Sequence, residues 1–278
     1  MKLDLHCHSY FSDGKHSPEF VLNRAKDNGV THLALTDHDC IDGVLDLRGQ
    51  YELSEIELIN GVEISTLWNS MEIHVVGLCI DANDLGLNTL LNTQQDKRRI
   101  RVKQIQLAME KAGITGLDDH MASQKCASPS RSHIADFLLL RNKFSSRKSA
   151  FKSLIKNGRF YAKPRWCSIS EAINSIQKAG GLSVLAHPHR YKLSNTKLKR
   201  LISDFKHYNG DAIEVCYSNI GNEVRDFLGR LSVDHELSAS IGSDFHDVKA
   251  SWMDIGKVLP LPEICKKNAI WLHPRWHF

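Results

Sequence analysis

Short apolar segments alternate with helical stretches at both ends of this 278-residue chain, and this alternation limits the possible folds more than any other feature. Strands that alternate with helices form βαβ units and a mainly parallel sheet. Seven such strands are enough to close a small barrel, so the sequence predicts an α/β fold. The predicted strands are 2–8, 31–39, 56–65, 71–78, 182–188, 212–216 and 239–246.

Capping residues and glycines mark the expected helices. Ser17 and Pro18 are residue types that begin a helix, and Gly29 is a type that ends one. The strand signal fades between about residues 81 and 163, and helical patterns replace it there. The predicted helices are 18–28, 94–112, 132–140, 149–156 and 171–179.

The composition excludes several classes of protein. With 42% apolar and 24% charged residues, the chain is neither disordered, nor collagen-like, nor a disulfide-stapled miniprotein. Its seven cysteines include no Cys-x-x-Cys pair, as expected of reduced cysteines. No apolar run approaches the ~20 residues of a membrane helix, and the N-terminus has no apolar signal region. We therefore expect a cytoplasmic protein.

The charges are unevenly distributed. Residues 97–165 carry 17 Lys and Arg against 4 Asp and Glu, a net charge of +13. The rest of the chain carries 19 against 28, a net charge of −9. An acidic part that is rich in histidine suits cations, and a basic block suits phosphate or nucleic acid. The alternative for the basic block is a solvated helical surface.

Polar side chains follow the predicted strands at the edge where active sites gather in closed α/β barrels. His6 and His8 are two residues apart in an extended segment, so both face the same side. Asp244 and His246 repeat this spacing. Glu63 lies in an apolar context, where a carboxylate needs a partner such as a cation. The full set of candidate metal ligands is His6, His8, Asp13, His38, Glu63, His74, His187, Asp244 and His246.

Six histidines and three carboxylates are too many ligands for one tetrahedral zinc ion and enough for two or three metal ions. Clustered metal ions catalyse phosphoester hydrolysis, because they generate hydroxide and stabilise charge on phosphate oxygens. The mixed nitrogen and oxygen set favours manganese, iron or zinc. No serine or cysteine nucleophile motif is evident, so we expect no catalytic side chain beyond the metal-bound hydroxide.

The polar residues belong to the motifs LHCHSYFSDG, LALTDHD, GVEIS, EIHVVGL, LAHPHR and GSDFH. Together these resemble the polymerase and histidinol phosphatase (PHP) family of phosphoesterases. The segments TDHDCIDGV and SRSHIADFL are similar to the subgroup of 3′,5′-nucleoside bisphosphate phosphatases and 5′-to-3′ exoribonucleases of the RNase AM type. The resemblance implies a distorted seven-stranded β/α barrel formed by residues 1–80 and 166–278. Residues 81–165 would be a mainly helical, basic insert that caps the active site.

The resemblance also implies three metal ions, typically manganese. His6, His8, Glu63 and Asp244 would bind the first ion; Glu63, His74 and His187 the second; and Asp13, His38 and His246 the third. Arg131 and His133, at the start of a predicted helix, and His189 would bind substrate phosphate. The alternatives are a surface ion pair for Arg131 and an ordinary loop histidine for His189.

The expected activity is hydrolysis of the 3′-phosphoester of 5′-phosphorylated nucleotides. Nucleoside 3′,5′-bisphosphates would lose the 3′-phosphate, and 5′-phosphorylated RNA would lose its first nucleotide as a 5′-monophosphate. We expect no membrane and no obligate protein partner. The alternatives are a histidinol-phosphate-type phosphatase, an amidohydrolase-like barrel, and a non-catalytic RNA-binding metalloprotein.

Overall fold

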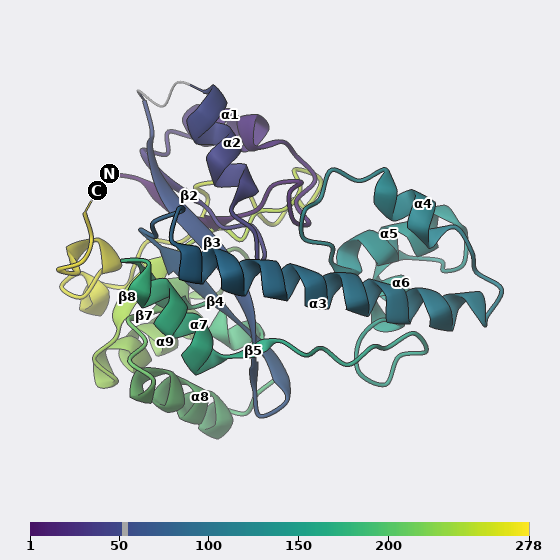
Figure 1. Ribbon diagram of the computed structural model, residues 1–278. Helices are drawn as coiled ribbons and strands as arrows, with labels where there is room; N and C mark the ends of the chain where they lie inside the picture. The colour runs from purple at the N-terminus through teal and green to yellow at the C-terminus, as the bar shows by residue number, and fades with distance from the viewer. Residues whose placement is uncertain (52–54, 278) are drawn as a thin grey trace.

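A nearly closed barrel is the centre of the computed structural model, which describes residues 1–51 and 55–277 (Figure 1). Neighbouring strands follow the order β1-β2-β3-β4-β6-β7-β8. A bridge between Cys7 and Phe245 brings the two ends of this order together. The strands are β1 (Leu3–Cys7), β2 (His32–Leu35), β3 (Glu57–Trp68), β4 (Met71–Leu78), β5 (Cys167–Ser168), β6 (Leu182–Leu185), β7 (Ala212–Cys216) and β8 (Ser238–Ile241).

The strand pairing confirms the seven predicted strands and a mainly parallel sheet, with two exceptions. Strand β4 is antiparallel to both β3 and β6, and the other neighbours in the order are parallel. Asn69 and Ser70 join β3 to β4 with φ angles of 48° and 65°. Two residues with positive φ form the tight turn that joins a twisted hairpin. The two-residue strand β5, which pairs with β3, was not predicted.

Helices cover the barrel from outside. The predicted helices α1 (Pro18–Asp27) and α7 (Ile169–Lys178) begin at the caps Ser17 and Ser168. Four helices were not predicted: α2 (Asp42–Gln50), α4 (Leu117–Ala122), α8 (Asn195–His207) and α9 (Asn222–Asp234). In α8 the buried residues have helical spacing, so its apolar face was a usable signal. These buried positions are Leu198, Leu201, Ile202 and Phe205.

Residues 81–165, here called the insert, are helical and project from one side of the barrel (Figure 1). The helices are α3 (Leu85–Glu110), α4 (Leu117–Ala122), α5 (Arg131–Leu140) and α6 (Arg147–Lys152). The insert has its own apolar core, which includes Ile105, Met109 and Phe137. Within residues 1–51 and 55–277, no helix is long and apolar enough to cross a bilayer.

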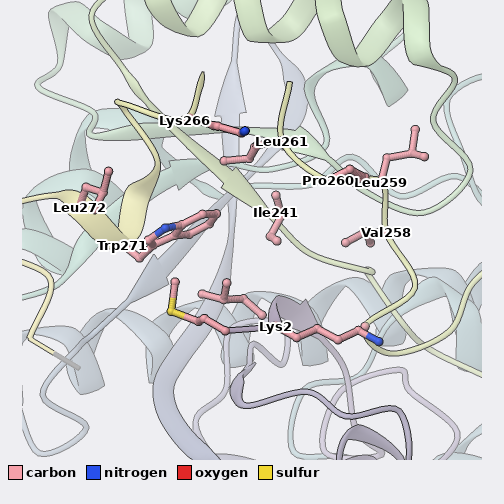
Figure 2. A pocket seen from close by; sticks show the side chains of 12 residues that line it. Lys2, Ile241, Val258, Leu259, Pro260, Leu261, Lys266, Trp271 and Leu272 are labelled. Carbon is pink, nitrogen blue, oxygen red and sulfur yellow. The ribbon is translucent and has the colours of Figure 1, made fainter. Parts of the chain in front are cut away.

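An apolar pocket of about 540 Å³ lies where the start of β1 meets the C-terminal segment (Figure 2). Lys2 and Leu3 line it, together with Ile241 and the side chain of Trp271. The segment around it contains two short 3₁₀ helices, η2 (Glu263–Cys265) and η3 (Ile270–Leu272). His6 and His8 lie toward the other end of β1, so this pocket is separate from the candidate metal ligands.

Candidate metal centre

Glu63 is the centre of the candidate site. It is fully buried in β3, where it follows the apolar residue Val62. Five histidines direct ring nitrogens at its carboxylate. One comes from each of five places: strand β1, the loop after β1, the loop after β2, strand β4, and the loop after β6. The distances from a ring nitrogen to a Glu63 oxygen are 3.4 Å for His6, 3.3 Å for His8, 2.8 Å for His38, 3.0 Å for His74 and 3.0 Å for His187.

Two aspartates and one more histidine complete the group. Asp13 Oδ1 lies 3.1 Å from His246 Nε2 and 3.5 Å from His38 Nε2. Asp244 Oδ1 lies 3.2 Å from His8 Nε2. All nine predicted ligands are therefore together, and we call them the histidine–carboxylate cluster: His6, His8, Asp13, His38, Glu63, His74, His187, Asp244 and His246.

Metal binding explains the arrangement of these side chains better than hydrogen bonding among them does. Four of its buried atoms make no hydrogen bond of acceptable geometry with the described residues, although polar atoms lie near: Asp13 Oδ1, His38 Nδ1, Glu63 Oε2 and His187 Nδ1. Buried polar atoms normally have a partner. Imidazole nitrogens and carboxylate oxygens are the usual ligands of zinc, iron and manganese. Cations at this position would supply the missing partners.

The side chains form four overlapping groups whose ligand atoms lie within 4.8 Å of one another. One group contains the three residues predicted to bind the third metal ion, together with His8. Another contains three of the four residues predicted to bind the first metal ion. The groups are His8, Asp13, His38 and His246; His6, His8 and Asp244; His6, Glu63 and His187; and His38, Glu63 and His74. Which group holds which ion therefore stays a prediction.

Glu214 orients two of the ligands, although it was not among the predicted site residues. Its Oε1 accepts a hydrogen bond from His6 Nδ1 at 2.8 Å. Its Oε2 accepts one from the backbone N–H of His187 at 2.6 Å. The first bond leaves His6 Nε2 free to bind a metal ion, as is usual for such carboxylate–histidine pairs. An acidic residue in the centre of the apolar strand β7 was the available signal.

Asp37 and Asp39, which flank His38, support loops. Asp37 accepts hydrogen bonds from Ser9 N at 2.7 Å and Ser12 Oγ at 2.6 Å, which fixes the loop that carries Asp13. Asp39 accepts a hydrogen bond at 2.8 Å from the backbone N–H of Ser65, which lies two residues after Glu63 on β3. The polar end of this strand therefore contributes one ligand to the cluster and two residues that hold its surroundings.

Three residues in or beside the cluster have a strained backbone conformation. Asp39, His187 and Asp244 have φ angles of 47°, 30° and 54°, in the left-handed region that residues other than glycine rarely adopt. Conformations of this kind cost on the order of 1–3 kcal/mol each and are found where surrounding structure enforces them. Two of these residues belong to the cluster, so its geometry is maintained against local preference.

A buried ion pair joins the insert to the cluster's surroundings. Arg98 on α3 donates from Nε to Asp39 Oδ2 at 2.7 Å and from Nη2 to Ser65 Oγ at 2.7 Å. The side chains of both charged partners are at most 3% exposed. Gln94 also donates to the Ser65 carbonyl. Helix α3 is thus attached to the strand that carries Glu63.

We expect Asp39→Ala to lower the free energy of unfolding by about 3–5 kcal/mol, because it leaves Arg98 as a buried, unpaired charge. Chemical denaturation of the metal-loaded protein measures this change. Glu263→Ala is the matched control, since Glu263 pairs with Lys266 on the surface and its side chain is 82% exposed. Equal effects of the two substitutions would contradict this account.

A cavity of about 130 Å³, here called the cap cavity, lies between the cluster and the insert. Glu72 on β4 forms ion pairs with Arg131 at 3.0 Å and with Arg101 at 3.9 Å. Burial alone would raise the pKa of Glu72, but Arg131 and the neighbouring His74 and Arg101 hold it well below its usual range. The lining residues are Asp13, His38, Glu72, His74, Arg98, Arg101, Ser130, Arg131, Ser132 and Phe151.

Arg101 is buried with unused hydrogen-bond donors. Its Nε and Nη1 atoms have no hydrogen-bond partner among the described residues, and its guanidinium lies 4.6 Å from the Trp166 ring centroid. Burial lowers the pKa of Arg101 to about 9, so it remains a cation at neutral pH. A buried cation with free donors beside an open cavity is suited to binding an anion.

Comparison with known proteins identifies the family. Residues 4–163 match the PHP domain. The 5′-3′ exoribonuclease Rnm of Escherichia coli is 40% identical over 263 residues, which are 93% of this chain and 89% of that protein. The chain belongs to the PHP domain family.

Two further proteins are similar to nearly the whole chain. The 3′,5′-nucleoside bisphosphate phosphatase of Chromobacterium violaceum is 36% identical over 97% of this chain and 95% of that protein. A solved structure of an amidohydrolase from the same organism, with bound sulfate and no metal, is 34% identical and has a TM-score of 0.89. The matched region includes 98% of this chain and 95% of the amidohydrolase chain. The predicted PHP resemblance, barrel fold and hydrolase class are confirmed.

The three predicted phosphate-binding residues of the PHP site lie in different places. Arg131 lines the cap cavity and is paired with Glu72. His133 is buried beside it, where its Nδ1 accepts the Ser130 N–H at 3.1 Å and caps α5. His189 is exposed in the short 3₁₀ helix η1 (Pro188–Arg190), which follows the ligand His187. The structure brings Arg131 to the cluster and leaves His133 and His189 outside the cap cavity, where phosphate binding by them stays a prediction.

Because His133 serves as a cap, it should make stability depend on pH. Burial lowers the pKa of His133 below its usual 6.5. As the pH falls, the imidazole of His133 therefore becomes protonated in the unfolded chain before it does so in the folded protein. The contribution of neutral His133 to the free energy of unfolding is present above pH 6.5 and decreases as the pH falls below that value. Glutamine at this position can also cap the helix without titrating. We expect thermal unfolding of His133→Gln to depend less on pH than that of the unmodified protein between pH 7.5 and 5.5, and parallel curves would contradict this.

Proposed function

We propose that this PHP protein hydrolyses the 3′-phosphoester of nucleotides that carry a 5′-phosphate. One site would then serve two substrates. A nucleoside 3′,5′-bisphosphate would give a 5′-mononucleotide and phosphate. A 5′-monophosphorylated RNA would give its first nucleotide as a 5′-monophosphate, in the 5′-to-3′ direction. The names of the E. coli and C. violaceum relatives support these two activities.

The observation that carries the proposal is the cap cavity, which places arginines of the insert beside the histidine–carboxylate cluster. Arg131 is the first residue of α5, so its backbone N–H belongs to a helix N-terminus, which favours anions. Arg131 adds a guanidinium, and Arg101 adds unused buried donors. A 5′-phosphate bound here would leave the 3′-phosphoester of the same nucleotide near the cluster.

Metal ions held by the nine cluster residues would supply activated water and stabilise charge on the phosphate oxygens. We propose three ions and manganese as the metal, with iron or zinc as alternatives that the same ligand types accept. Glu214 keeps His6 and His187 in position for this task, and Asp37 keeps the Asp13 loop in position.

The chain's own residues would bind and orient the substrate. Glu72, whose carboxylate stays ionised next to Arg131, holds that guanidinium toward the cavity until a phosphate competes for it. Phe151 provides an apolar surface in the cavity for the ribose or base. The insert would thus be a cap on a barrel made of residues 1–80 and 166–278. The seven cysteines form no disulfide, which supports a reducing cytoplasmic location.

The test is product analysis with a 5′-monophosphorylated RNA oligomer in the presence of manganese. We expect stepwise release of nucleoside 5′-monophosphates, with the shortened RNA again carrying a 5′-phosphate. Asp13→Ala should abolish this release. Release from the 3′ end, or release only of inorganic phosphate from small phosphomonoesters, would contradict the proposal and indicate a histidinol-phosphate-type phosphatase. Tight RNA binding without cleavage would indicate a non-catalytic metalloprotein.

A further inference from the structure

A second cavity opens beside the cluster and is not used by the proposed 5′-phosphate site. It has a volume of about 380 Å³, within the range of small-molecule sites. We call it the Trp252 pocket. It shares no lining residue with the cap cavity. Its lining residues are His189, Arg190, Tyr217, Ser218, Asn219, Ile220, Gly221, Val224, Trp252 and Met253.

Arg190 connects this pocket directly to the cluster. Its Nη1 contacts Asp244 Oδ2, and its Nη2 donates to the Ser218 carbonyl at 3.3 Å. Its guanidinium lies 5.1 Å from the Tyr217 ring centroid. The cap cavity is lined by other residues of the cluster, namely Asp13, His38 and His74. A substrate that passes the cluster could therefore enter both cavities.

The chemistry of the pocket suits a nucleotide. Its lining contains two basic side chains and two aromatic ones, and no acidic side chain. Trp252 is 62% exposed, which is unusual for a large aromatic residue. Ser218 is 2% exposed, and its Oγ has no hydrogen-bond partner among the described residues. A stacking surface, a cation and an unused hydroxyl are the groups that bind single-stranded nucleic acid.

Trp252 lies on a fixed loop. Two residues later, Asp254 accepts hydrogen bonds from Arg24 Nε at 3.0 Å and Nη2 at 2.7 Å. Asp254 Oδ1 also accepts the Ile255 N–H at 3.0 Å, and Ile255 is buried. The loop is therefore anchored to α1 directly after Trp252, so little ordering is needed before a base stacks on it.

We propose that the Trp252 pocket binds the second nucleotide of a 5′-phosphorylated RNA, on the far side of the phosphate that is attacked. This inference rests on the proposed function. In that reaction the oxygen of water joins phosphorus, the bond from phosphorus to O3′ of the first nucleotide breaks, and O3′ takes up a proton. The second nucleotide stays attached to the phosphate through its O5′. A 3′,5′-bisphosphate has no second nucleotide, so the pocket would distinguish the two substrates.

The test compares Trp252→Ala on the RNA dinucleotide pApA and on adenosine 3′,5′-bisphosphate. We expect the KM for pApA to rise about tenfold, because base stacking on an aromatic side chain makes a contribution of this order. The KM for the bisphosphate should change less than twofold. Trp252→Phe keeps an aromatic ring and should restore most of the pApA affinity. Tyr208→Ala, at an exposed aromatic residue at the end of α8, is the control and should change neither KM.

An unchanged KM for pApA in Trp252→Ala, or an equal rise for both substrates, would overturn the inference. Binding of a non-hydrolysable pApA analogue, followed by fluorescence anisotropy, separates this outcome from failure of the proposed reaction. If the unmodified protein cleaves neither substrate, a tenfold loss of analogue binding in Trp252→Ala still supports the pocket. Equal binding by the two proteins in that case would overturn it.

Discussion

Replacing Glu63 with glutamine should reduce kcat/KM by about 10³-fold or more and reduce the metal content of the purified protein. Glu63 is fully buried and faces five histidines of the cluster, so its negative charge is central to any cation bound there. Metal ions contribute several kcal/mol of charge stabilisation to phosphoester hydrolysis, and each 1.36 kcal/mol corresponds to tenfold in rate. Elemental analysis and steady-state kinetics on adenosine 3′,5′-bisphosphate measure the two effects.

Glu57→Gln is the matched control for this substitution. Glu57 has the same residue type on the same strand β3, but it is exposed at the start of the strand. It should keep full metal content and activity. If Glu63→Gln retained metal and activity at the level of Glu57→Gln, the cluster would not be the metal centre.

Arg131→Ala should reduce kcat/KM for 5′-phosphorylated RNA by about 10²-fold, since hydrogen bonds to a charged group contribute about 1.5–3 kcal/mol. Cleavage of 5′-hydroxyl RNA of the same sequence, which we expect to be slow, should change little, because that substrate lacks the phosphate that Arg131 would bind. Rates on the two RNAs, measured side by side, give the ratio that reports 5′-phosphate recognition.

The control for Arg131 is Arg147→Ala. Arg147 is another insert arginine, half exposed and paired with Asp136. It should leave both rates unchanged. If the unmodified protein cleaved 5′-hydroxyl RNA as fast as 5′-phosphorylated RNA, the cap cavity would have no role in recognising the 5′ end.

The barrel and the cluster were predictable because polar residues interrupt apolar strands at one edge. His6, Glu63 and Asp244 stand in segments that would otherwise be core, and each needed a partner that the sequence could not supply nearby. The antiparallel arrangement of β4 was less visible, since only the two-residue turn at Asn69 and Ser70 marks that hairpin.

The residues that support the cluster were harder to predict. Arg98 and Asp39 are 59 positions apart, and His6 and Glu214 are 208 positions apart. Such buried pairs are formed only by tertiary packing, so local sequence carries little sign of them. For His133, the position near a helix start predicted phosphate binding, and packing adds a contact that the prediction did not include: the His133 ring accepts the Ser130 N–H at the start of α5.

Metal-dependent hydrolysis of the 3′-phosphoester is tested with adenosine 3′,5′-bisphosphate, using the metal-stripped protein and the same protein reloaded with manganese. Chromatography identifies which monophosphate forms, and a phosphate assay gives its stoichiometry. We expect adenosine 5′-monophosphate and one equivalent of phosphate from the reloaded protein, and no turnover from the stripped protein. Formation of adenosine 3′-monophosphate, or equal rates with and without metal, would contradict this expectation.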